Sequence, residues 1–185
     1  MEQIKWPFLK QTWGIEFESS KGAYLYTKDG RKILDAAGGA IVNNIGYGRE
    51  EVAEAISRAV INNSYILPPF LTPEREALLD ELRNHWLPSH LTRIHLSSGG
   101  SEANESAVKL AIQYQASRGK PEKNIILTRS LSYHGTTLNM SGISGHEARK
   151  RGLESYVPSP TTIETPYPLR CPLGSFHPDS KDYYL

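Results

Sequence analysis

The sequence predicts an α/β fold, because two consecutive segments each combine a short apolar strand, a loop of small polar residues and a helix. The first strand is expected over Arg93–Leu96 and the second over Asn124–Thr128. The composition agrees, since 185 residues with 38% hydrophobic and 22% charged side chains are typical of a globular protein. Two strands do not complete a parallel sheet, so we expect an incomplete one.

Charge and cysteine content exclude several classes of protein. A formal charge of +1 with scattered charges gives no basic surface for nucleic acid or an anionic membrane. No run approaches the roughly 20 apolar residues of a membrane span, and the first residues lack the apolar core of a signal peptide. The single cysteine, Cys171, precedes a proline and is expected to be incidental rather than nucleophilic. We therefore expect a cytoplasmic protein, with small molecules or other proteins as partners.

The N-terminal part is expected to begin with a hairpin. Two β-rich runs, Tyr24–Thr27 and Lys32–Asp35, flank the turn dipeptide Asp29-Gly30. The following segment, Asp35–Gly48, mixes glycines and asparagines with isoleucine and valine. Such a glycine density lets backbone approach backbone or a ligand, and we interpret the segment as an irregular, closely packed connector.

Two helices follow and are interpreted as scaffold. Glu50–Ile61 carries one apolar stripe at helical spacing. In the second helix Thr72 is the predicted N-cap and Pro73 occupies the first helical position. The apolar residues of both helices are expected to be core.

The loop "SSGGSE" before the third helix is a candidate anion site. A helix beginning after Ser101 as N-cap would present free N–H groups and the positive end of its dipole at one point. Gly99 and Gly100 would let the backbone approach phosphate oxygens, provided that Glu102 turns its carboxylate away. The residues alone leave open a second interpretation, in which Ser101 only caps the helix and the glycines only make a turn.

The second loop adds an aromatic ring and an imidazole. Tyr133 and His134 follow the strand that ends at Thr128, where open α/β sheets usually bind ligands. A planar, phosphorylated ligand would fit between the two loops. Taken singly, Tyr133 could instead seal the sheet edge, and His134 could be a hydrogen-bonded structural histidine. The proline-rich segment over residues 157–180 is interpreted as an extended connector.

Taken together, these motifs resemble the class III, ornithine-type, pyridoxal-phosphate-dependent aminotransferases. "SSGGSEANESAVKLAIQY" followed by "SYHGTT" is similar to the family pattern S-G-[ST]-E-A-x-E-x-A, a long helix and [FY]-H-G. "GRKILDAAGGAIVNNIGYGREEVAEAI" and "PYPLRCPLG" resemble two further family segments, so the similarity runs from about Gly22 to Gly174. Within the family's G-H-x-x-P, Tyr47 replaces histidine and Glu50 replaces proline.

The resemblance implies an incomplete fold-type I transferase with pyridoxal 5'-phosphate as cofactor. Residues 1–60 would be the N-terminal segment of the small domain, and residues 61–185 the N-terminal part of the large cofactor-binding α/β domain. Carried over residue by residue, the family pattern implies four cofactor-binding residues, Gly100 and Ser101 on the phosphate, Tyr133 on the pyridine ring and His134 completing the motif. Ala40 and Ile41 would face the substrate.

The implied reaction transfers an amino group from an amino acid or amine to a keto acid, and the implied assembly is a homodimer. In the family, the lysine that binds the cofactor and the acid that holds the ring nitrogen lie beyond [FY]-H-G. Neither can be assigned here, so we predict an N-terminal portion that is inactive alone. Three alternatives stay open: an aminomutase or isomerase of the same fold, a truncated non-catalytic protein that pairs with a full-length relative, and a nucleotide-binding domain. The last is disfavoured because the sequence lacks G-x-G-x-x-G and G-x-x-x-x-G-K-[ST].

Overall fold

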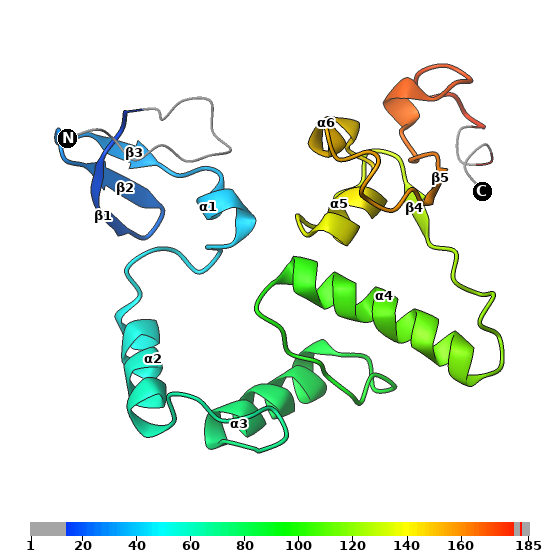
Figure 1. Ribbon diagram of the computed structural model, residues 1–185. Coiled ribbons are helices and arrows are strands. Elements are labelled where there is room, and N and C mark those ends of the chain that lie inside the picture. Colours follow the sequence, from blue (N-terminus) through cyan, green and yellow to red (C-terminus); the bar gives the residue numbers. More distant parts are fainter. Residues whose placement is uncertain (1–13, 180–181, 183–185) are drawn as a thin grey trace. The chain divides into compact units, whose positions relative to one another are not determined.

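The computed structural model describes residues 14–179 and residue 182 (Figure 1). By its internal contacts the chain divides after His90 into two compact units, Met1–His90 and Leu91–Leu185. Each unit has a sheet of its own. The predicted boundary between family domains at residues 60 and 61 stays a prediction, because a compact unit of this chain need not be a domain of the family.

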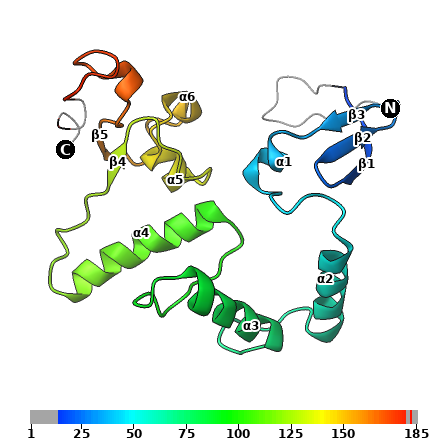
Figure 2. The same cartoon turned by 180° about the vertical axis from the view of Figure 1, so that it is seen from behind.

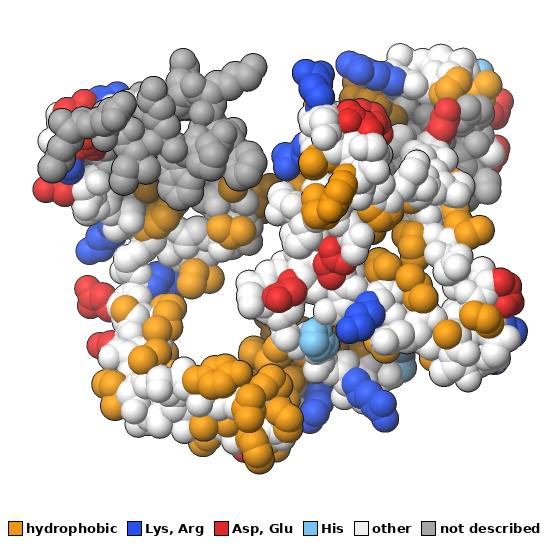
Figure 3. Space-filling model, viewed as in Figure 1, with side chains coloured by type: hydrophobic (Ala, Val, Ile, Leu, Met, Phe, Trp, Pro, Cys, Tyr) orange, Lys and Arg blue, Asp and Glu red, His pale blue; other side chains and the backbone are white. Residues whose placement is uncertain are grey.

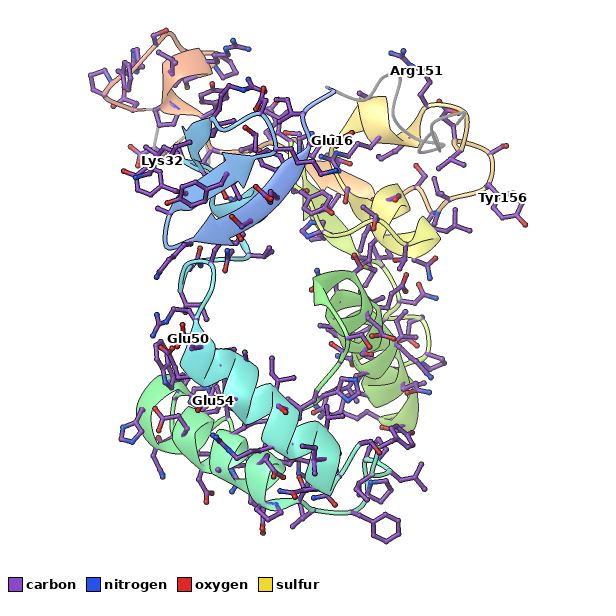
Figure 4. The ribbon with its side chains drawn as sticks, turned by 90° about the vertical axis from the view of Figure 1, so that its left-hand side faces the viewer. Glu16, Lys32, Glu50, Glu54, Arg151 and Tyr156 are labelled. Carbon is purple, nitrogen blue, oxygen red and sulfur yellow. The ribbon has the colours of Figure 1, made fainter. Side chains whose placement is uncertain are left out.

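An antiparallel three-stranded sheet opens the N-terminal unit (Figure 1). Its strands, in the order β1 (Phe17–Lys21), β2 (Tyr24–Thr27) and β3 (Lys32–Leu34), are neighbours in sequence. The predicted hairpin is confirmed as β2 and β3, with Gly30 at φ +84° in the turn. On one face of the hairpin, the ammonium group of Lys32 lies 3.9 Å from the ring centroid of Tyr24 (Figure 4).

The glycine-rich connector approaches the hairpin backbone closely at Gly46 and Gly48, as its glycines suggested, but it is not closely packed throughout, since Ile41 and Val42 are 81% and 83% exposed. It contains a left-handed turn that the sequence did not predict. This turn, α1 (Gly38–Ile41), has φ values of 56°, 60°, 62° and 72° at its four residues. The connector returns to the sheet through paired backbone hydrogen bonds between Gly22 and Tyr47, of 2.9 and 2.8 Å.

The two scaffold helices form where predicted. They are α2 (Glu50–Asn62) and α3 (Pro73–Glu81), the latter continuing into the π-helical turn η1 (Leu82–Trp86). Thr72 is the N-cap of α3, since its hydroxyl oxygen accepts the N–H of Arg75 at 3.3 Å.

The expectation that these helices bury their apolar residues is wrong for this unit. Neither helix has a buried residue, and Ile56, Val60 and Ile61 of α2 are 58%, 56% and 79% exposed. Figure 3 shows apolar side chains gathered over α2 and α3. The helical periodicity is correct, but no described segment of this unit covers the apolar stripe.

Helices and a two-stranded parallel sheet make up the C-terminal unit (Figure 2). Its elements are α4 (Gly100–Ser117), β4 (Leu127–Arg129), α5 (Leu138–Ile143), α6 (Glu147–Lys150), β5 (Thr161–Ile163) and the 3-10 turn η2 (Pro168–Arg170). Leu127 of β4 pairs with Thr161 of β5. Among the described residues, the buried apolar side chains are Met140, Ile143 and Cys171, all in this unit.

Three sequence predictions for this unit need correction. Arg93–Leu96 forms no strand, because no described segment supplies the ladder of hydrogen bonds that a short apolar run requires. The second predicted strand begins later, at Leu127, and ends at Arg129. The proline-rich segment is not only a connector, since the β-branched run Thr161–Ile163 pairs with β4.

Close packing of α5 generates a prediction about Gly142. A Cβ atom at this buried glycine would lie 2.7 Å from both Cδ and the carbonyl oxygen of Pro158. We expect Gly142→Ala to lower the free energy of unfolding by about 1–3 kcal/mol through overpacking, as measured by urea denaturation. Gly100→Ala is the matched control, because its Cβ would meet nothing within 4 Å in the first turn of α4. Equal effects of the two changes would contradict the packing argument.

Candidate functional site

The start of α4 presents backbone N–H groups that the helix itself does not use. Gly99 is the N-cap, with an extended backbone at φ −174°, and the Ala103 N–H donates to its carbonyl at 3.0 Å. The N–H groups of Gly100, Ser101 and Glu102 therefore precede the first bond within the helix. These groups and the positive end of the helix dipole suit an anion.

Ser101 is not the N-cap that the sequence predicted. It lies in the first turn of α4, because Gly99 takes the capping position with an extended backbone. Its hydroxyl oxygen instead accepts the N–H of Thr136 at 3.1 Å. The side chain thus connects the loop before α4 to the loop that carries Tyr133.

The carboxylate of Glu102 is engaged by the loop before the helix. It accepts the N–H of Ser98 at 2.8 Å, in the manner of a capping box. The phosphate hypothesis requires this side chain to turn away from a bound anion. A carboxylate that folds back onto Ser98 agrees with that requirement.

Gly135 lies where the two loops meet. It is buried, with φ +142°, and a Cβ atom there would lie 2.5 Å from the Ser101 hydroxyl oxygen and 2.9 Å from its Cα. Only glycine permits this approach without displacing Ser101. The structure therefore brings the two loops of the predicted site together at one point.

Tyr133 presents an accessible aromatic ring beside this contact. Its side chain is 52% exposed, and the guanidinium carbon of Arg149 lies 4.8 Å from the ring centroid. A ring has two faces, and this cation covers one of them. Because about half of the side chain stays exposed, the ring can still receive a planar group.

His134 is held by three hydrogen bonds of its own loop and its neighbours. Its N–H donates to the Ser144 hydroxyl oxygen at 2.9 Å, and its carbonyl accepts Asn104 Nδ2 at 2.8 Å. The imidazole Nε2 lies 3.0 Å from Oγ1 of Thr128, a residue that is only 4% exposed. Of the two interpretations that the sequence left open, this geometry favours the hydrogen-bonded structural histidine.

Hydroxyl protons around Thr128 determine the tautomer of His134. Ser132 donates its single hydroxyl proton to the carbonyl of Arg129 at 2.6 Å, so at the 3.0 Å contact with Thr128 it can only accept. Thr128 must then donate to Ser132 and accept from the imidazole. Neutral His134 accordingly carries its proton on Nε2.

Two residues that the sequence analysis did not single out support the loop. Glu105 accepts hydrogen bonds from the Thr137 hydroxyl at 2.5 Å and from Asn139 Nδ2 at 3.0 Å, and Thr137 caps α5. Asn104 holds the His134 carbonyl. Both belong to the quoted motif "SEANE", where polar residues spaced for one side of the helix were a usable signal.

The two residues expected to face the substrate belong to the N-terminal unit. Ala40 and Ile41 lie in the left-handed turn α1, and Ile41 is 81% exposed. A cavity of about 850 Å³ adjoins this turn and is lined by Asp35, Ile41 and Tyr47, among others.

Other kinds of site are not found in the part of the chain that the structure describes. Across residues 14–179 and residue 182, no group of three or more His, Cys, Asp or Glu side chains could hold a metal ion. No helix in those ranges has the length and apolar character needed to cross a membrane. Cys171, which was expected to be incidental, is 6% exposed.

Comparisons with known proteins identify the family of this chain. The family described as aminotransferase class-III matches residues 10–180. A probable aminotransferase of Mycobacterium tuberculosis is 36% identical over 163 residues, which cover 88% of this chain and 34% of the relative. The putrescine–pyruvate aminotransferase of Pseudomonas aeruginosa is 29% identical over 149 residues, covering 80% of this chain and 33% of the relative. The chain spans about a third of the length of these relatives.

Solved structures show the same fold. A thermostable (S)-enantioselective omega-transaminase from Thermomicrobium roseum superposes with a TM-score of 0.79 and 28% identity, over 84% of this chain and 35% of that one. A PLP-bound amine transaminase from an uncultivated Pseudomonas species gives 0.87 at 23% identity, over 100% of this chain and 43% of that one, which supports the fold alone. The family match and these folds identify the chain as a member of the class III aminotransferases, which have fold-type I architecture and pyridoxal phosphate as cofactor.

Proposed function

We propose that this protein acts as a pyridoxal-phosphate-dependent transaminase that moves an amino group from an amino acid or amine to a keto acid. The observation that carries the proposal is the junction of two loops at Gly135, where Ser101 accepts the Thr136 N–H. This junction joins an anion-accepting helix start to an exposed aromatic ring. The relatives named above are aminotransferases, which supports the same reaction class.

The residues at the junction fit the cofactor. The free N–H groups at Gly100 and Ser101 are donors for a phosphate, and the Ser101 hydroxyl keeps a proton to donate because it only accepts from Thr136. The exposed ring of Tyr133 can stack on a pyridine ring. We assign phosphate binding to Gly100 and Ser101, and ring stacking to Tyr133.

His134 contributes to this site as a positioning residue. Its imidazole is directed at Thr128 and its N–H at Ser144, so it fixes the backbone that carries Tyr133. Arg149 restrains the same ring from one face. When bound, pyridoxal phosphate supplies the electron sink that makes the α-carbon proton of an amino donor labile.

The proposal includes the wider organisation that the family resemblance implies. Residues 1–60 would belong to the small domain and residues 61–185 to the large one, with Ala40 and Ile41 facing the substrate of a homodimeric enzyme. No lysine in these 185 residues is assigned to covalent cofactor binding. Lys109, for example, lies within α4, and Lys150 pairs with Glu147 at 3.0 Å.

An isotope experiment tests the reaction class. The protein as it occurs in its cells would receive an amino donor labelled with nitrogen-15 and a keto acid. A transaminase delivers the label to the carbon skeleton of the keto acid, as mass spectrometry would show. Label that only changes position within the donor would instead support the aminomutase alternative, and no movement of label would overturn both.

Borohydride reduction tests the absence of an assigned lysine. We expect the 185-residue chain with pyridoxal phosphate to show weak, reversible binding and no stoichiometric covalent product, because the proposed contacts are only those of Gly100 and Ser101 with the phosphate and of Tyr133 with the ring. Intact-mass spectrometry after reduction measures this. One cofactor fixed on one particular lysine would refute the expectation.

Phosphate binding by Ser101 gives a mutational prediction. Ser101→Ala removes a donor to the phosphate and the acceptor of the Thr136 N–H, so we expect about tenfold weaker binding of pyridoxal phosphate. Binding of pyridoxal, which lacks the phosphate, should change less. Absorbance titration measures both affinities, and Ser106→Ala, one helical turn or so further along α4, is the control. An equal loss for both compounds would argue against a phosphate contact.

The hydrogen bond between Thr128 and His134 gives a second mutational prediction. Thr128→Val keeps the side-chain shape but removes the buried hydroxyl that bonds His134 and Ser132, so we expect a loss of about 1–2 kcal/mol in unfolding free energy. Thr162→Val, at the exposed paired position of β5, should change stability by less than about 0.5 kcal/mol.

Nitrogen-15 chemical shifts of the wild-type His134 imidazole should report a proton on Nε2. A dominant Nδ1–H form would contradict the proton assignment.

A further inference from the structure

The left-handed turn α1 has a backbone conformation that side chains disfavour. Gly38 and Gly39 adopt it at little cost, but Ala40 and Ile41 follow at φ 62° and 72°. A run of left-handed residues that includes two with Cβ atoms persists only where its surroundings hold it. Ile41 is 81% exposed, so burial of its side chain does not supply this hold.

Asp35 supplies hydrogen bonds at the start of the turn. Its carboxylate accepts the Ala37 N–H at 3.0 Å on Oδ1 and the Gly39 N–H at 2.7 Å on Oδ2. Within the turn, the Gly38 carbonyl accepts from Val42 at 3.1 Å. The carboxylate is thus the group that ties the first half of α1 to the end of β3.

Tyr47 fixes that carboxylate from the far end of the connector. Its hydroxyl donates to Oδ2 of Asp35 at 2.7 Å, and its backbone pairs with Gly22 of the hairpin. The ring reaches under the turn, because a Cβ atom at Gly39 would lie 3.1 Å from the Tyr47 hydroxyl oxygen. Tyr47 therefore pairs the end of the connector with the hairpin and also binds the carboxylate that accepts N–H groups of α1.

The titration behaviour of the pair agrees with a charge-assisted hydrogen bond. The Tyr47 hydroxyl is the main cause that lowers the pKa of Asp35, with the Gly39 N–H next. The carboxylate in turn raises the pKa of Tyr47, against a smaller opposing effect of a hydrogen bond with Asn43. The hydrogen bond from neutral Tyr47 to ionised Asp35 is therefore fully formed at pH values between the pKa of Asp35 and the pKa of Tyr47. It weakens when acid protonates Asp35 or when alkali deprotonates Tyr47.

We propose that Tyr47 is a positioning residue whose hydroxyl, through the Asp35 carboxylate, holds α1 in the shape that presents Ile41 to the substrate. The part that concerns the substrate rests on the proposed function, because the assignment of Ala40 and Ile41 as substrate-facing residues belongs to that proposal. Ile41 offers an exposed hydrocarbon side chain beside the cavity that Asp35 and Tyr47 line. Ile41 would accordingly contact an apolar group of the amino donor.

Hydrogen exchange tests the hold without any cofactor or substrate. In the full-length protein, Tyr47→Phe should speed amide exchange at Ala37 and Gly39 about tenfold, because the carboxylate that accepts both N–H groups loses its anchor. Asp35→Asn should act in the same direction. Tyr47→His, which restores the residue of the family pattern and an N–H donor, should recover part of the protection.

Tyr156→Phe is the matched control. Tyr156 belongs to the C-terminal unit, is 79% exposed and projects outward (Figure 4), so this substitution removes a phenol hydroxyl that is not part of the connector. Its exchange at Ala37 and Gly39 should equal that of the wild type. Unchanged exchange in Tyr47→Phe, or an equal increase in Tyr156→Phe, would overturn the positioning role.

Steady-state kinetics test the substrate part separately. Tyr47→Phe should raise KM about tenfold for a donor with an apolar chain and leave kcat and the KM of a small donor within about twofold. Faster exchange without this KM difference would overturn the link between the turn and the substrate while leaving the hold intact. If the wild-type protein as it occurs in its cells transfers no amino group, the proposed function fails, and the exchange result still decides the role of Tyr47.

Discussion

The close contact between Gly135 and Ser101 is the constraint on which the candidate site depends. A glycine without Cβ lets one loop approach within hydrogen-bonding distance of the first turn of α4, where Ser101 accepts the Thr136 N–H. The free N–H groups of the helix and the ring of Tyr133 are useful to one ligand only if their loops stay in register. This contact keeps them so, and a single methyl group at Gly135 would separate them.

Polar side chains, more than apolar burial, support that contact. The described core is small, with Met140, Ile143 and Cys171 as its buried apolar residues. Thr128 and Ser144, both almost fully buried, bind the side chain and the backbone N–H of His134. Because unpaired hydroxyls at such positions would be costly, the network admits few alternative arrangements of the loop. Its specificity comes from hydrogen-bond pairing.

Local signals in the sequence predicted the elements that depend on local physics. The Asp29-Gly30 hairpin, the Thr72 cap and a helix after the SSGG loop all formed, because turn and cap preferences act over a few residues. Arg93–Leu96 failed as a strand and Thr161–Ile163 was missed, because pairing depends on a partner far along the chain. The N-cap is Gly99 and not the predicted Ser101 for the same reason: the Ser101 hydroxyl pairs with Thr136, a partner far along the chain.

The connector and the loop that carries Tyr133 solve one physical problem in two ways. Each must hold an irregular backbone that local preference does not favour. At the loop that carries Tyr133, the neutral hydroxyl of Ser101 and the missing Cβ of Gly135 suffice, because the approach is a matter of space. At α1 the left-handed residues include Ala40 and Ile41, so space is not enough and an ionised acid is used. A charged acceptor binds N–H groups more strongly, and the Tyr47 hydroxyl holds this carboxylate in place and lowers the pKa of Asp35. The stronger acceptor, the Asp35 carboxylate, is thus found at α1, where residues with Cβ atoms adopt the left-handed conformation.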